Sequence, residues 1–336
     1  MTHATEASPE LFFQTLWAYQ RTAALKAAIE LDLFSAVGDG AATAEAIASA
    51  VGASPKGTRV LCDYLTMLGF FTKRDGTYQL TPDSAFFLTR RSPAYLGGTL
   101  EFLMSDAIVG NHDQLAAAVR AGGVTDAGND TVSEENPVWE KFARAMVPMM
   151  AMPAQAIAGI LGVEGAGPLR VLDIAAGHGL FGVTIAQRNP AAEVVAVDWP
   201  GVLKVATEHA QAAGVGGRHR TVPGDAFSVD WGTGYDVALV TNFLHHFDLA
   251  ACTGLLRKVH ASLVDNGRVA ILEFVPDEDR VGPPLQASFA IAMLAGTKAG
   301  DAYTMSEIAA MLGDAGFRDV ARHDLQGPQT VIVATR

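Results

Sequence analysis

The stretch Val171-Leu-Asp-Ile-Ala-Ala-Gly-His-Gly-Leu-Phe-Gly182 decides the fold of this chain. An apolar run leads to an acid, then to small residues, and then to an amphipathic run from Phe181 to Arg188. That order predicts a strand, a tight turn and a helix. Gly177 and Gly179 allow the backbone of the turn to approach a ligand, and the N-terminus of the helix offers free N–H groups.

A second predicted strand, Glu193 to Val197, ends in Asp198. An acid at the end of the second strand, about 20 residues after a glycine turn, is placed to bind the two hydroxyls of a ribose. A structural turn without a ligand would explain the glycines alone. Their pairing with Asp198 favours a cofactor that contains a nucleoside.

The acid that precedes the turn argues against a dinucleotide. A nicotinamide site has the pattern G-x-G-x-x-G, so that the pyrophosphate rests on the helix N-terminus. This chain has D-x-A-A-G-x-G instead, and Asp173 would repel a pyrophosphate. Asp173 suits a cofactor with a cationic group, such as the amino group of the methionine in S-adenosylmethionine.

Further short motifs follow in order: Val197-Asp-Trp-Pro200, Gly224-Asp-Ala-Phe227, Thr241-Asn-Phe-Leu-His-His-Phe-Asp248 and Ala270-Ile-Leu-Glu273. With the glycine turn, they resemble the class I S-adenosylmethionine-dependent methyltransferases. Their order is similar to that of the two-domain small-molecule O-methyltransferases, the plant caffeate and hydroxyindole type and their bacterial relatives. The resemblance covers nearly the whole chain. It implies S-adenosylmethionine as cofactor and S-adenosylhomocysteine as product.

By this resemblance, Asp198 binds the ribose, while Asp225 and Phe227 hold and cover the adenine. The remaining predicted cofactor residues belong to the same motifs and are Asp173, Ala175, Gly177, Gly179, Trp199, Ala226 and Asn242.

One departure lies in the glycine turn itself. Relatives usually carry glycine where this chain has Ala175 and Ala176. Because alanine disfavours positive φ, we expect both positions to keep ordinary backbone angles and cofactor binding to survive.

His245 follows the fourth predicted strand, where the resemblance places the catalytic base. Histidine suits that role because its pKa lies near working pH, so it can take a proton from an acidic hydroxyl. Glu273 ends the fifth strand and could fix the tautomer of the ring. The family has a second glutamate in a later string, which here reads Ala299-Gly-Asp-Ala-Tyr-Thr304 and has Ala302 at that place. This departure leaves the reaction class open.

The acceptor pocket is predicted to be apolar and to take a flat, aromatic or polyketide-like molecule. Methionine and aromatic residues at helical spacing are more often plain core, but as a set they favour such an acceptor. The candidates are Met104, His112, Trp139, Phe142, Met146 and Met149 on one side, Phe289 and Met293 on the other, and His246.

The fold class predicted is α/β: a Rossmann-like class I methyltransferase domain with an N-terminal winged-helix, mostly helical dimerisation domain. The expected divisions are residues 1–95, a helical connector over 96–165, and the cofactor domain over 166–336. Predicted strands are Arg170–Ile174, Glu193–Val197, Arg218–Val222, Tyr235–Thr241, Gly267–Phe274, Asp319–His323 and Thr330–Ala334. The resemblance implies an antiparallel last strand.

In the N-terminal part, apolar residues at helical spacing over 11–31 predict a helix, and Leu33-Phe34 a turn. Helices over 44–51 and after Ser54-Pro55 are followed by a hairpin around Asp75-Gly76. A polar loop is predicted over 121–136. The uncharged segment from Ala145 to Val163 is interpreted as a buried helix and pocket wall, because its prolines and alanines do not fit a membrane span.

Composition limits the partners. A formal charge of −12 argues against nucleic acid, because phosphate contacts need a basic face. Two cysteines, Cys62 and Cys252, indicate a reducing compartment, and the polar N-terminus carries no signal-peptide pattern, so we expect a cytoplasmic protein. The resemblance implies a homodimer.

Several alternatives stay open. The His-His-x-Asp string could be half of a metal site, although no third ligand is evident, and we predict no metal. Methyl transfer to nitrogen or carbon would use the same cofactor site. The fold could also serve a non-methylating reaction, or a winged-helix regulator that senses S-adenosylmethionine.

Overall fold

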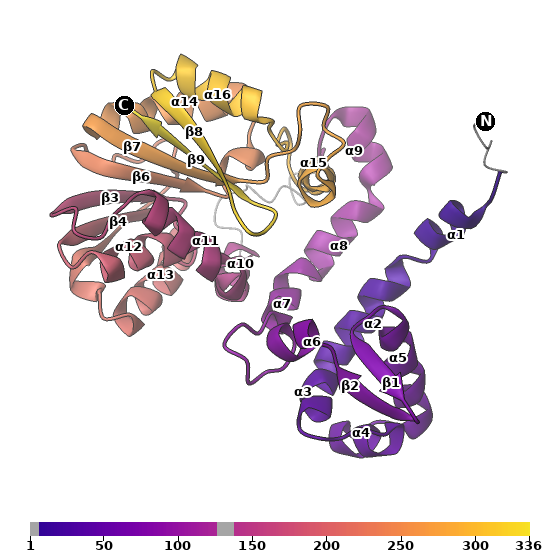
Figure 1. Ribbon diagram of the computed structural model, residues 1–336. Helices are drawn as coiled ribbons and strands as arrows, with labels where there is room; N and C mark the ends of the chain where they lie inside the picture. The colour runs from indigo at the N-terminus through magenta and orange to yellow at the C-terminus, as the bar shows by residue number, and fades with distance from the viewer. Residues whose placement is uncertain (1–6, 126–137) are drawn as a thin grey trace, which may run out of the picture. The chain divides into compact units, whose positions relative to one another are not determined.

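The computed structural model describes residues 7–125 and 138–336. The chain divides into two compact units between Leu100 and Glu101 (Figure 1). The loop predicted over 121–136 lies mostly outside the described residues.

The first unit is a winged helix with additional helices. Its elements are α1 (Glu10–Leu16), α2 (Tyr19–Glu30), α3 (Leu33–Gly38), α4 (Ala44–Val51), α5 (Pro55–Met67), β1 (Phe71–Arg74), β2 (Thr77–Leu80), α6 (Pro82–Phe87) and η1 (Gly97–Thr99). The hydroxyls of Thr43 and Ser54 accept backbone N–H bonds and begin α4 and α5. The hairpin of β1 and β2 closes at Asp75-Gly76, as its sequence predicts.

The turn predicted at Leu33-Phe34 is wrong. The chain turns one residue earlier, at Asp32, which has a φ of 57°. Leu33 and Phe34 then begin α3, and both side chains are buried in the core of this unit with Ile47, Phe71 and Tyr78. Their apolar character therefore reflects burial in a helix.

The first helix presents apolar side chains to solvent. Leu11, Phe12 and Leu16 of α1 are each more than half exposed in the single chain, as are Trp17 just after α1 and Tyr19 at the start of α2. An apolar surface of this kind is typical of a protein–protein interface.

The second unit begins with helices and continues as alternating strands and helices. Its elements are α7 (Leu100–Leu103), α8 (Asp106–Asp113), α9 (Leu115–Ala121), α10 (Val138–Ala145), α11 (Val147–Ile160), β3 (Leu169–Ile174), α12 (Leu180–Arg188), β4 (Ala192–Asp198), α13 (Pro200–Ala212), η2 (Gly216–Arg218), β5 (His219–Pro223), β6 (Tyr235–Thr241), η3 (Leu244–His246), α14 (Leu249–Ser262), β7 (Leu263–Glu273), α15 (Pro284–Gly296), α16 (Met305–Asp314), β8 (Arg318–Asp324) and β9 (Thr330–Thr335). Over 7–125 and 138–336, no helix has the length and apolarity that a bilayer crossing needs.

The sheet of this unit has seven strands in the order β5-β4-β3-β6-β7-β9-β8. The strands from β5 to β7 run parallel, and β9 lies antiparallel to both of its neighbours. The predicted α/β class, the strands and the antiparallel last strand are thus confirmed.

Alternate side chains of the strands are buried on opposite faces of the sheet. Leu172, Ile174 and Val240 pack beneath α14 and α16. Val171 and Leu239 face the other way, toward α11 and α12. The carboxyl ends of the parallel strands meet at one edge, where ligands of open α/β sheets bind.

Candidate active site

A cavity of about 300 Å³ lies at the carboxyl edge of the sheet. Its walls come from the segments that follow β3, β4, β5 and β6, together with α10. Eight of the predicted cofactor residues line it: Ala175, Gly177, Asp198, Trp199, Asp225, Ala226, Phe227 and Asn242. Gly179 and Asp173 do not.

Asp198 is held at the end of β4 by the neighbouring backbone. Its Oδ2 accepts a bond of 2.8 Å from the N–H of Gly177, and its Oδ1 accepts one of 2.7 Å from the N–H of Trp199. Burial raises the pKa of Asp198 to about 6, and the two backbone donors oppose that rise. Each oxygen keeps a second lone pair for a ligand hydroxyl.

The expectation that Ala175 keeps an ordinary backbone angle is wrong. Ala175 has a φ of 51°, in the left-handed region, whereas Ala176 does not adopt positive φ. The turn imposes this angle because Ala176 must donate its N–H to Val197 of the adjacent strand, at 3.1 Å. A left-handed alanine costs about 1 kcal/mol, which the surrounding packing must offset.

Gly179 serves packing in this structure. It precedes α12 at a φ of 70°, and an added Cβ would lie 2.8 Å from the Cβ of Ala206 in α13. Glycine is therefore required for the close approach of α12 and α13. A sequence pattern cannot distinguish this role from ligand contact.

Asp173 lies fully buried behind the cavity wall. Its Oδ2 accepts a bond of 3.0 Å from the N–H of Gly182 near the start of α12. Its Oδ1 has no hydrogen-bond partner among the described residues. Burial raises the pKa of this carboxyl to about 7.

The loop after β5 is organised by Lys258, which the sequence reasoning missed. The Nζ of Lys258 donates to the carbonyls of Ala226, Phe227 and Val229, at 3.0, 3.2 and 2.6 Å. It also lies 3.8 Å from the ring centroid of Trp231. Because Lys258 comes from α14, no local motif could have connected it to this loop.

His245 and Glu273 form a buried pair at the ends of β6 and β7. The Nδ1 of His245 lies 2.5 Å from Oε2 of Glu273, and only 5% of His245 is exposed. Oε1 of Glu273 accepts the N–H groups of Phe243 and Leu244, at 3.1 and 2.9 Å. Because an ionised carboxylate can only accept, this contact favours the His245 tautomer that carries its proton on Nδ1.

The histidine that lines the cavity is His246, whereas His245 lies behind it and packs edge-on against Phe289 of α15, with ring centroids 4.8 Å apart. Nδ1 of His246 has no hydrogen-bond partner in the described parts of the chain. Burial, and secondarily the charge of His245, hold the pKa of His246 well below its usual range. His246 is therefore a neutral ring beside Trp139.

Only some of the predicted acceptor residues gather here. Trp139, Phe142 and His246 line the cavity, and Phe289 touches His245. Met146, Met149 and Met293 pack away from the cavity lining, Met104 is half-buried outside it, and His112 is exposed with its Nδ1 bonded to the carbonyl of Ile108.

Other lining residues were missed by the sequence reasoning. They include His178, Phe181, Val202, Gly224, Phe243 and Phe247. Most of them flank residues that the sequence had already singled out, and this neighbouring position could have identified them. Across the described residues, no three or more His, Cys, Asp or Glu side chains gather as a metal site would require.

Comparisons with known protein families agree with this geometry. Residues 114–318 match an O-methyltransferase domain, and residues 13–90 match an O-methyltransferase dimerisation domain. The 3-hydroxy-5-methyl-1-naphthoate 3-O-methyltransferase of Streptomyces sahachiroi is 30% identical over 91% of this chain and 87% of its own length. TcmO of Streptomyces glaucescens, a tetracenomycin polyketide synthesis 8-O-methyl transferase, is 26% identical over 99% of this chain and 98% of its own.

Solved structures show the same fold. A Nostoc punctiforme protein assigned provisionally as an O-methyltransferase is 48% identical, covers 99% of this chain and 100% of its own, and superposes with a TM-score of 0.93. Human N-acetylserotonin methyltransferase, solved in complex with S-adenosylmethionine, is 23% identical, covers 100% of this chain and 99% of its own, and has a TM-score of 0.82.

Proposed function

The chain belongs to the O-methyltransferase family, and we propose that it methylates a hydroxyl of a flat, hydrophobic small molecule with His245 as general base. The cofactor is S-adenosylmethionine. The observation that carries the base assignment is the buried 2.5 Å contact between His245 and Glu273. A neutral histidine held by a carboxylate is a suitable acceptor for a hydroxyl proton.

The residues around the cavity fit the cofactor. Asp198 keeps lone pairs for the two ribose hydroxyls, and the loop of Asp225 and Phe227 offers a polar group and a ring to the adenine. Asp173 does not line the cavity, but its buried carboxyl lies at the end of β3, where its Oδ1 has no partner among the described residues and a negative charge would favour the cationic amino group of the methionine. When bound, the cofactor supplies a methyl group on a positively charged sulfur.

His245 performs the proton transfer in this proposal. Glu273 accepts from Nδ1 of His245, which leaves Nε2 as the nitrogen that would take up the hydroxyl proton. As the acceptor oxygen loses its proton, Nε2 takes it up, and the carboxylate of Glu273 stabilises the resulting imidazolium. We place the acceptor hydroxyl between His246 and Phe289, because these two rings flank His245.

The acceptor class follows from the rings near this point. Trp139, Phe142, Phe243 and Phe247 line the cavity, and Phe289 stacks on Phe274 at 4.1 Å beside His245. Such walls favour a planar aromatic acceptor. The hydroxynaphthoate named for the Streptomyces sahachiroi relative is of that kind.

A homodimer is part of the proposal. It is supported by the match to a dimerisation domain and by the exposed apolar side chains of α1. Light scattering at micromolar concentration is expected to give twice the chain mass of 35.2 kDa. A monomer at that concentration would contradict it.

The function is tested by mixing the protein and S-adenosylmethionine with a panel of naphthols, hydroxynaphthoates and simple phenols. Release of S-adenosylhomocysteine with a flat hydroxyarene, and a product with an O-methyl group by mass spectrometry and NMR, is the expected result. A relative that is an L-tyrosine C(3)-methyltransferase, 27% identical, makes a ring C-methyl product the main alternative to exclude. Turnover that yields only C-methyl product would overturn the proposal.

A further inference from the structure

We propose that Tyr303 is a positioning residue for His245, because its hydroxyl holds the backbone at the end of the turn that carries the histidine. The inference rests on the proposed role of His245 as base. Its evidence is the segment from Thr297 to Glu307, which packs against the turn that carries His245.

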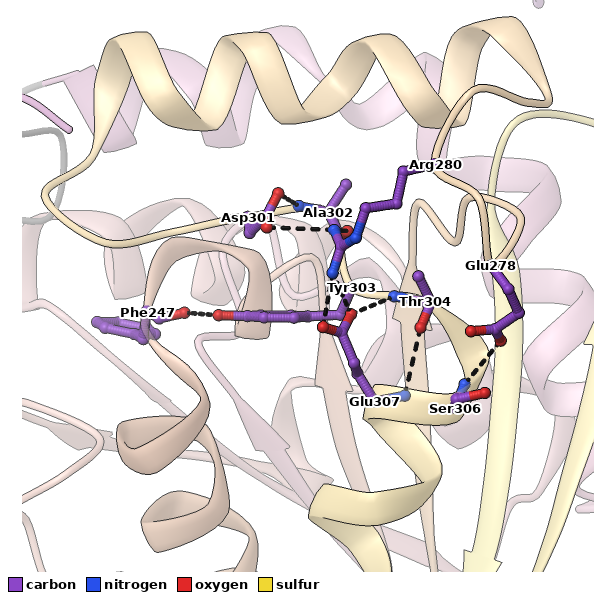
Figure 2. Close-up of polar contacts among 9 residues, drawn as sticks. All are labelled: Phe247, Glu278, Arg280, Asp301, Ala302, Tyr303, Thr304, Ser306 and Glu307. Carbon is purple, nitrogen blue, oxygen red and sulfur yellow. Dashed lines mark hydrogen bonds and ion pairs between the residues drawn. The ribbon is translucent and has the colours of Figure 1, made fainter. Parts of the chain in front are cut away.

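Tyr303 bonds to the end of the catalytic turn. Its hydroxyl donates to the carbonyl of Phe247, two residues after His245 (Figure 2). Tyr303 is buried in the core beneath α14 and α16, so its ring has little freedom. Phe247 also lines the cavity, which means that this bond fixes a wall of the site.

Gly300 brings the same segment against the turn itself. An added Cβ at Gly300 would lie 2.2 Å from the carbonyl oxygen of His245 and 3.0 Å from the carbonyl carbon of His246. The N–H of Gly300 donates to Oγ1 of Thr297 at 2.9 Å. The backbone of the turn therefore rests directly on this segment.

Arg280 anchors the segment on both sides of Tyr303 (Figure 2). Its guanidinium donates to both carboxylate oxygens of Glu307 at 2.6 Å and to the carbonyl of Ala302 at 3.0 Å, and it pairs with Asp301 at 3.2 Å. Glu307 in turn accepts the N–H of Thr304 at 2.9 Å and completes a capping box at the start of α16. Tyr303 is thus fixed between two anchored neighbours.

The turn is consequently held at both ends. Glu273 binds the N–H groups of Phe243 and Leu244 at its start, and Tyr303 binds the carbonyl of Phe247 at its finish. Ala302 carries no carboxylate, and the ring of His245 bonds to Glu273. Because a misplacement of 1 Å can cost about 100-fold in rate, loss of the Tyr303 bond is expected to reduce turnover.

The experiment compares Tyr303→Phe with Tyr235→Phe. Tyr235 is a matched control: it is also buried, and its hydroxyl also donates to a backbone carbonyl, that of Trp231, but at the start of β6, away from the catalytic turn. Both variants are expected to lower the Tm. Only Tyr303→Phe is expected to lower kcat, by roughly 5- to 50-fold, and to shift the acid limb of the pH–rate profile.

Equal kcat values in the two variants would overturn the proposal, because a purely structural bond would affect Tm alone. Gly300→Ala, which pushes on the same turn, is expected to lower kcat at least as much as Tyr303→Phe. In a His245→Ala background, Tyr303→Phe is expected to cause no further loss. An undiminished loss there would show that Tyr303 does not act through His245. Full activity of His245→Ala alone would instead refute the base assignment.

Discussion

The residues proposed for the cofactor and those proposed for the acceptor come from different kinds of element. Of the proposed cofactor residues, Asp198 and Asp225 follow β4 and β5 and reach the cavity as their sequence positions predict. The proposed acceptor residues come from helices, and several of them, such as Met146 and His112, do not line the cavity.

This difference shows that the place of a residue in the sequence predicts its place in space better at the end of a strand than on a helix. Register fixes a residue at a strand end, because Asp198 pairs with Pro223 and Ile174 pairs with Val197 across the parallel strands. A residue on a helix can face any direction, and its direction depends on how the helix packs. We therefore expect substitutions at strand ends to change turnover or cofactor affinity strongly. Substitutions of the candidates on helices are expected to have effects that range from small to large.

The largest effect is expected for His245→Ala. Removing a positioned base costs about 10²–10⁴-fold in turnover. Binding of S-adenosylhomocysteine, measured by calorimetry, is expected to stay close to that of the wild type. His246→Ala is the matched control, and it is expected to lose much less turnover. A larger loss for His246→Ala would move the base to the histidine that lines the cavity.

Asp198→Ala is expected to weaken the binding of S-adenosylhomocysteine at least about tenfold, because hydrogen bonds to a charged group are worth roughly 1.5–3 kcal/mol each. Calorimetry would measure it, with circular dichroism to confirm the fold. Since the pKa of Asp198 is raised to about 6, its carboxylate takes up a proton below that pH. Affinity in the wild type should then fall between about pH 7 and pH 5.

That fall should be smaller in Asp198→Asn, which cannot titrate at this position; Asp173, whose pKa is raised to about 7, would account for what remains. The same slope in wild type and Asp198→Asn would assign the pH dependence to another group, and unchanged affinity in Asp198→Ala would exclude Asp198 from the ribose site.

Lys258→Met is expected to weaken the binding of S-adenosylhomocysteine by roughly 3- to 10-fold. This corresponds to the net free energy of about one hydrogen bond, which we take as the cost of a less ordered loop. The loss should be equal for 5′-methylthioadenosine, because Lys258 supports the loop of Ala226 and Phe227 that is proposed to hold the adenine. Lys204→Met, on the exposed side of α13, is the control and should bind normally. A loss confined to the intact cofactor would place the effect of Lys258 elsewhere.

The smallest effect is expected for His112→Ala. His112 is exposed and bonds to its own helix, so the KM of the acceptor should change by less than about twofold, the size typical of a surface substitution. Phe142→Ala, which removes a cavity-lining ring, should raise that KM by more. Steady-state kinetics with one acceptor would decide between them. A greater effect at His112 would mean that the acceptor extends along α8.

Much of the fold could be predicted because the strands alternate regularly and end in distinctive residues. The seven strands, the hairpin at Asp75-Gly76 and the caps at Thr43 and Ser54 all follow from local chemistry. Two local predictions were wrong where packing overrode preference. Ala175 accepts a left-handed angle because the turn demands it, and Leu33 begins a helix because Asp32 makes the turn first.

Contacts made over long sequence separations were not predictable. Tyr303 and Phe247 are 56 residues apart, and Lys258 reaches its loop from α14. The position of His246 in the cavity wall, in front of His245, depends on how η3 turns after β6. A sequence pattern carries no signal for any of these.

The base assignment is tested most directly by measuring how the penalty of His245→Ala depends on the acidity of the acceptor. A neutral phenol and a nitrophenol that is ionised at the assay pH would be compared at saturating S-adenosylmethionine. If His245 removes the proton, the penalty is expected to be about 10²-fold or more on the neutral phenol and only severalfold on the ionised one. Equal penalties on both acceptors, or full turnover of the variant on the neutral phenol, would contradict the assignment.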